Sequence, residues 1–133
     1  RRKAGVMAHR FKKHYTLAEA RAMMPRVKEW LNSMVQLRHE YDTVSKRVDN
    51  MMSAQSDVGG DSVNQSIKLL SEIQAILGEF KTHQIFIKDA ERGLVDFPSR
   101  RGTREVFLCW EKSEDDIAHW HELDTGYDNR ESL

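Results

Sequence analysis

Several protein classes are excluded by what the chain has little of. It contains one cysteine, Cys109, so an internal disulfide is impossible and a reducing, cytoplasmic location is expected. No stretch approaches the ~20 apolar residues needed to cross a bilayer, so no membrane partner is expected. The 21 basic and 21 acidic residues cancel. No overall field therefore draws the chain to nucleic acid or to anionic lipid.

The length of 133 residues suffices for one modest core. Residues 1–14 are basic and lack an apolar pattern, and we expect them to form a flexible N-terminal arm. Residues 15–133 are expected to form a single domain. Within it, residues 16–84 should be a helical hairpin, and residues 85–133 a β-meander with a tail.

The first helix is predicted from its start signal and from its period. Thr16-Leu17-Ala18-Glu19 has the form of a capping box, so a helix should begin there. Pro25 predicts a short helix from Leu17 to about Met24 and a kink there, with the long helix continuing beyond it. A heptad-like spacing of three and four predicts a long, coiled-coil-like helix. The residues of this stripe are Ala20, Met23, Val27, Trp30, Met34, Leu37, Tyr41, Val44, Val48 and Met51.

A second helix should follow a turn at residues 56–62. Asp61 or Ser62 can cap it. Its apolar residues repeat the same spacing, so it should lie antiparallel on the first helix and bury this stripe in the core. The stripe comprises Val63, Ile67, Leu70, Ile73, Leu77 and Phe80.

The period changes after about Gln84. Short runs that favour β-structure lie at residues 85–87, 94–97, 105–110 and 117–123, separated by turn-forming segments. The order of helices and then strands predicts an α+β fold: a long antiparallel helical hairpin, kinked near Pro25, followed by a small antiparallel β-meander.

Strand pairing assigns residues to the two faces of this meander. If Ser99 pairs with Arg104, Phe97 faces Val106. One face is then apolar and should pack on the helical hairpin, whereas the other is mixed. The apolar face comprises Val95, Phe97, Val106, Leu108 and Trp110, and the mixed face Leu94, Asp96, Glu105, Phe107 and Cys109.

The last strand has two possible registers. An even loop after Trp110 places His119 and His121 on the apolar face, where two unpartnered imidazoles cost ~1–3 kcal/mol each. An odd loop places Trp120 there and leaves both histidines beside Cys109. We favour the odd loop on energetic grounds, although a β-bulge would reverse the parity.

The odd register gathers potential metal ligands. Asp96, Cys109 and His121 are the ligand types of zinc or another divalent transition metal. The alternative is a set of surface polar groups that bond to one another. A thiolate–imidazole pair of Cys109 and His121 has no third orienting group at an identifiable spacing.

The chain carries the segments GLVDFPSR, LCW and WH. Through these segments, and over nearly the whole chain from Tyr15, it resembles a small bacterial family known as domain of unknown function 2203. This resemblance implies no established activity. Residues 113–116 stand where the family usually has a Gly-Glu turn, and Tyr127 where it often has Phe. The resemblance marks as patterned Asp89, Gly93, Asp96, Phe97, Pro98, Arg100, Cys109, Trp110, Trp120, His121, Gly126 and Arg130.

Three functions are compatible with this sequence. The first is a non-enzymatic interaction or dimerisation module with Trp30 and Tyr41 as interface anchors and a protein partner or a second copy. The second is a metal-binding or hydrolytic site at His121, Asp96 and Cys109. A purely structural alternative is that His121 and Arg130 bond carboxylates and hold the C-terminal tail over the sheet. The candidate functional cluster comprises Asp89, Asp96, Arg100, Cys109, Trp120, His121, Asp124 and Arg130.

The third function is nucleic-acid binding through the basic arm and the arginines at positions 100, 101 and 104. We do not favour it, because Glu114, Asp115 and Asp116 at the neighbouring turn would repel phosphate.

Overall fold

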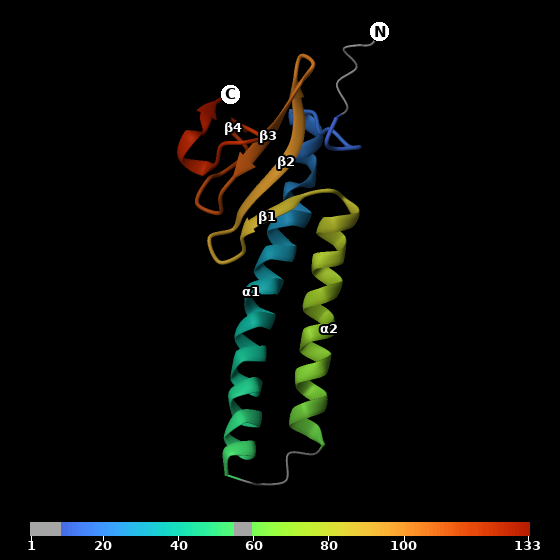
Figure 1. Ribbon diagram of the computed structural model, residues 1–133, viewed down its shortest axis with the longest axis vertical. Helices are drawn as coiled ribbons and strands as arrows, with labels where there is room; N and C mark the ends of the chain where they lie inside the picture. Colours follow the sequence, from blue (N-terminus) through green and yellow to red (C-terminus); the bar gives the residue numbers. More distant parts are fainter. Residues whose placement is uncertain (1–8, 55–59) are drawn as a thin grey trace. The chain divides into compact units, whose positions relative to one another are not determined.

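Two helices precede an antiparallel sheet, which confirms the α+β class (Figure 1). The computed structural model describes residues 9–54 and 60–133. None of the helices in these residues is long and apolar enough to span a membrane. The elements are α1 (Leu17–Ser53), α2 (Asp61–Thr82), β1 (Phe86–Asp89), β2 (Leu94–Arg101), β3 (Arg104–Trp110), β4 (His119–Glu122), a 3-10 turn (Tyr127–Asn129) and β5 (Glu131–Ser132).

The chain divides into two compact units. Among the described residues, the sheet unit combines residues 9–25 with residues 84–133, and the helical unit comprises residues 26–54 and 60–83. Each is described by itself below. That residues 15–133 form a single domain stays a prediction.

The predicted capping box begins α1. The Thr16 amide donates to the Glu19 carboxylate at 2.9 Å, and the Glu19 amide donates to the Thr16 hydroxyl at 3.1 Å. These bonds satisfy amides that a helix start leaves without a partner. The helix then runs continuously through Pro25 to Ser53. A kink at Pro25 and a coiled-coil geometry stay predictions.

Aromatic packing joins α1 and α2 within the helical unit. The Trp30 ring lies 5.2 Å from the Phe80 ring and 5.5 Å from the His83 ring. The first predicted stripe is correct, because all its residues from Val27 to Met51 are buried or half-buried. Gly60 precedes α2, and within the part of the chain that the structure describes no side chain caps this helix start, so the cap expected from Asp61 or Ser62 is not found there.

The predicted α2 stripe is wrong in part. Phe80 is buried, but Ile67, Leu70 and Leu77 are exposed, and Leu69 is buried although it was not assigned to the core. The reason is that α2 carries two neighbouring apolar lines with the same spacing, and spacing alone cannot choose between them. The inner line includes Leu69, Ile73, Ile76 and Phe80.

The sheet has the order β1-β2-β3-β4-β5, with antiparallel neighbours. The expected pairing of Ser99 with Arg104 is wrong, because Arg101 pairs with Arg104 and Ser99 with Val106. A turn of only two residues joins β2 to β3, and Gly102 supplies its positive φ of 66°. The error is two residues, so the predicted faces of both strands are correct.

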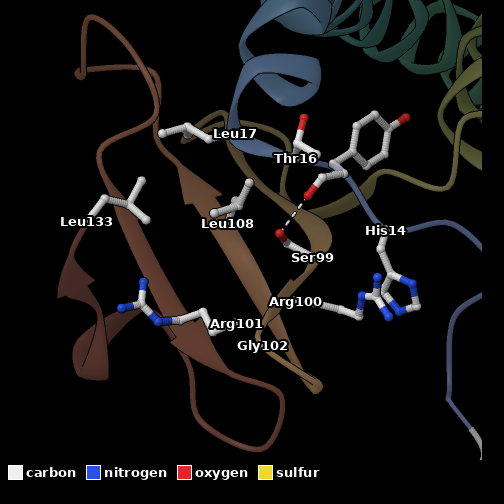
Figure 2. Close-up of a pocket in the computed structure, with 10 residues that line it drawn as sticks. His14, Thr16, Leu17, Ser99, Arg100, Arg101, Gly102, Leu108 and Leu133 are labelled. Carbon is white, nitrogen blue, oxygen red and sulfur yellow. Dashed lines mark hydrogen bonds between the residues drawn. The ribbon is translucent and has the colours of Figure 1, made fainter.

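The segment before α1 is bonded to the edge of β2. The Tyr15 amide donates to the Pro98 carbonyl at 2.7 Å. The Ser99 hydroxyl donates to the Tyr15 carbonyl at 2.6 Å (Figure 2). Pro98 has no amide hydrogen, so it could not complete an ordinary ladder with another strand at this edge.

Residues 9–14 of the predicted arm also contact the sheet unit. The amides of Arg10 and Phe11 donate to the Glu105 carboxylate at 2.8 and 3.0 Å, and His14 Nε2 lies 2.8 Å from it. Burial raises the pKa of Glu105, but these bonds lower it by more, to about 2. Residues 1–8 lie outside the described residues, and flexibility of the arm stays a prediction.

The register of β4 confirms the odd loop. His119 pairs with Cys109, Trp120 with Leu108 and His121 with Phe107. Both histidines therefore share the face of Cys109, and Trp120 lies on the apolar face. The short β5 was not predicted. It pairs with β4 through Ser132 and Glu131.

Candidate functional site

A buried ion pair lies on the mixed face of the sheet. Asp96 in β2 is 1% exposed and His121 in β4 is 2% exposed. His121 Nε2 lies 3.1 Å from both carboxylate oxygens of Asp96. Cys109 in β3 pairs with Asp96 in the ladder, so adjacent strands bring the three side chains together.

Both ring nitrogens of His121 face acceptors. Nδ1 lies 2.8 Å from the Glu122 carbonyl oxygen, and Nε2 faces Asp96. A neutral imidazole has only one N–H, so bonds from both nitrogens to acceptors require the protonated, positively charged ring. Burial lowers the pKa of His121, but Asp96 and the Glu122 carbonyl raise it by more, so it lies above its usual value.

Cys109 is a protonated thiol in this environment. Burial, the negative charge of Asp96 and a hydrogen bond to Asp96 raise the pKa of Cys109 to about 12, against an opposing effect of Arg130. The thiolate is the nucleophilic form of cysteine. The arrangement therefore does not provide an activated nucleophile.

Glu114 positions Arg130 next to this thiol. Arg130 Nη1 lies 3.0 Å from both carboxylate oxygens of Glu114, and the Glu111 amide donates to the same carboxylate at 2.9 Å. The Arg130 guanidinium also lies over the Tyr127 ring at 4.1 Å. Glu114, in the turn that follows β3, thus binds the C-terminal segment to the sheet.

A cavity of about 230 Å³ opens beside the ion pair. Sequence reasoning missed several of its lining residues, among them Lys88 and Tyr127. Lys88 lies at the irregular part of the β1–β2 pairing, and Tyr127 in a turn far along the chain. Neither position follows from strand alternation, and no sequence signal identifies them.

The other predicted site residues have different positions. Asp89 accepts a hydrogen bond from the Arg92 amide at 3.1 Å and so closes the β1–β2 turn. Trp120 lies on the apolar face, with the Arg101 guanidinium 4.3 Å from its ring. Arg100 is exposed and lines a second cavity of about 370 Å³ (Figure 2). Asp124 is exposed after β4. Of the predicted cluster, the structure brings together Asp96, Cys109, His121 and Arg130.

The buried triad can also be considered as a metal site. One ligand atom each from Asp96, Cys109 and His121 lies within 4.8 Å of the others. The bond from His121 Nδ1–H to a backbone carbonyl is typical of metal-binding histidines. Arg130 interacts with the thiol and is an opposing feature, because its positive charge repels a cation.

Comparison with known proteins identifies the family. The family described as "Uncharacterized conserved protein (DUF2203)" matches residues 13–133. The chain belongs to this DUF2203 family. No curated protein and no solved structure matches it. In this DUF2203 member, the matched range contains the whole sheet and the buried triad.

Proposed function

We propose that the protein is a non-enzymatic interaction module that forms a homodimer through α2. The supporting observation is the α2 stripe, defined as Ile67, Leu70 and Leu77, whose residues are 58%, 42% and 43% exposed. They lie on one line of the helix, at positions that a heptad places against a neighbouring helix. Contiguous exposed apolar residues mark interaction surfaces.

A second copy suits this stripe because the chain does not repel itself. Its formal net charge is zero at pH 7, so two copies approach without a net electrostatic barrier. Two-fold dimers are also the commonest closed assemblies and use one self-complementary patch.

The charges along α2 favour an antiparallel pairing. Gln74 and Lys81 continue the line of the α2 stripe. A parallel pairing in register would set Lys81 against Lys81 of the second copy, which is unfavourable. An antiparallel pairing whose two-fold axis passes at the level of Glu72 keeps the two Lys81 side chains apart. It sets Ile67 opposite Leu77 of the second copy and Leu70 opposite Gln74 of the second copy.

Trp30 and Tyr41 remain proposed secondary anchors. Trp30 contacts Phe80 and His83 within the helical unit, and both anchors are half-buried. They therefore have less surface to offer a partner than Ile67 has. A cytoplasmic location is part of the proposal because Cys109 is a buried free thiol.

Solution mass tests the dimer. We expect light scattering to give twice the monomer mass of 15.5 kDa at high concentration. Leu70→Glu should convert the protein to monomer, because it places two charges in the apolar contact. Gln65→Glu is the matched control on another line of α2 and should stay dimeric. A wild-type protein that is monomeric over a wide concentration range, or a dimer that Leu70→Glu leaves intact, contradicts the proposal.

A divalent transition metal at Asp96, Cys109 and His121 is the alternative function, supported by the proximity of their ligand atoms. Zinc would hold the thiol deprotonated. Elemental analysis of untagged protein should then give one metal per chain, which Cys109→Ser and His121→Asn remove. Absence of metal, together with unchanged unfolding in a chelator, would exclude this alternative.

A further inference from the structure

A second group of metal-ligand side chains lies at the N-terminal arm. We name it the arm cluster and define it as His9, His14 and Glu105. His14 Nε2 lies 2.8 Å and His9 Nδ1 3.9 Å from the same oxygen of Glu105. The two imidazole rings meet edge to face, with centroids 5.1 Å apart. One ligand atom from each residue lies within 4.8 Å of the others.

Other contacts hold the arm cluster together without any ion. Phe11 lies between the two histidines in the sequence. Its ring packs on the rings of Phe86 and Phe107, with centroids 5.4 Å from each. The Lys13 amide donates to the Gln84 side chain at 3.2 Å. These contacts pre-arrange the ligands, which lowers the conformational cost of binding.

We propose that His9, His14 and Glu105 bind one divalent transition metal ion, with zinc as the best-suited class. Two imidazoles and a carboxylate are a common zinc donor set that leaves one position for water. Bonds of 2.0–2.1 Å in a tetrahedral site place ligand atoms ~3.3 Å apart. The distances of 2.8 and 3.9 Å to Glu105 lie on either side of this value, and all three ligand atoms lie within 4.8 Å of one another. Side-chain adjustments of about 0.5–1.5 Å therefore bring them to bonding positions.

The ion replaces one hydrogen bond and joins the arm to β3. His14 Nε2 now faces the Glu105 carboxylate as a hydrogen-bond partner. In the metal complex this nitrogen binds the ion and the ring carries its proton on Nδ1. The His9 side chain is 37% exposed, so the ion reaches the arm cluster directly from solvent. The arm cluster differs in this from the buried triad.

Zinc titration of the untagged 133-residue chain tests the site. We expect one zinc ion per chain to bind at the arm cluster. His9→Asn and His14→Asn should weaken its affinity by more than the ~10–100-fold that loss of an outer-shell partner costs. His39→Asn, at an exposed position in α1, is the matched control and should leave affinity unchanged.

Trypsin cleavage gives a second readout. The arm carries trypsin sites at Arg10, Lys12 and Lys13. Zinc should slow cleavage there at least several-fold in the wild-type chain and in His39→Asn, but not in His14→Asn. Zinc affinity that survives both His9→Asn and His14→Asn, or that is lost in His121→Asn instead, overturns the proposal. So does a wild-type chain that binds no zinc.

Discussion

The sheet unit buries Asp96, Cys109 and His121, each at most 2% exposed, whereas the helical unit leaves Ile67 58% exposed. Both regions depart from the usual separation of polar and apolar residues, but in opposite directions. Asp96 and His121 are hydrogen-bonded within the sheet unit. Ile67, Leu70 and Leu77 of α2 remain open to solvent. The comparison sets buried polar groups that bond to one another against an apolar helix surface, which we propose a second copy covers.

Breaking the buried ion pair should have the largest effect on stability. Asp96→Ala leaves the His121 ring without its carboxylate and should lower the free energy of unfolding by ~3–5 kcal/mol in urea titration. Asp128→Ala, at an exposed position, is the control and should change it by less than ~0.5 kcal/mol.

The double variant Asp96→Leu with His121→Phe asks whether the pair has only a structural role. Replacement of both partners by apolar groups should recover most of the stability lost in Asp96→Ala. A loss for Asp96→Ala as small as for Asp128→Ala would contradict the buried pair.

Adjacent leucines of α2 test the comparison within one helix. Leu69 is 6% exposed and Leu70 is 42% exposed. At concentrations where the dimer dissociates, Leu69→Ala should cost ~2–4 kcal/mol. Leu70→Ala should cost less than ~1 kcal/mol, because much of its side chain is already in water. Chemical unfolding of both variants measures the difference, and equal losses would assign Leu70 to the core.

The smallest effect is expected at the start of α1. Thr16→Ala removes the capping hydroxyl and should cost ~1 kcal/mol. The hydrogen bond donated by the Thr16 amide lowers the pKa of the Glu19 carboxyl, and burial raises this pKa by less. The contribution of Glu19 is therefore present above the pKa of an unfolded glutamate and is lost as pH falls. Glu19→Gln should accordingly cost more at pH 7 than at pH 3 in urea titrations. An equal cost at both values would contradict the ionised cap.

The residues on each face of the sheet were predictable from the sequence, because they depend only on whether the loop between two paired strands has an odd or an even number of residues. The predicted β2–β3 pairing was wrong by two residues, but Val106 and Leu108 lie on the face that was predicted for them. The same alternation located Asp96, Cys109 and His121 on one surface. An error of two residues in the length of a loop leaves every side chain on its predicted face. For this reason the sequence could predict that the residues at the centre of the site share one face.

The remainder depended on contacts that periodicity does not encode. The two apolar lines of α2 have the same spacing, so Leu70 could not be distinguished from a core residue. The contact of Arg130 with Glu114 joins residues 16 positions apart through a turn. The two-residue β5 is too short to give a pattern. Tertiary packing alone positions these groups.

A distance between two copies of α2 tests the central claim most directly. Because Cys109 is buried, a cysteine introduced by Ser71→Cys can be spin-labelled selectively. Antiparallel helices at an interaxial distance of ~8–10 Å should bring the two labels within ~25 Å in a pulsed electron-resonance measurement. Adding Leu70→Glu should abolish this signal. A signal that is absent without Leu70→Glu, or that persists with it, would contradict a dimer formed through the α2 stripe.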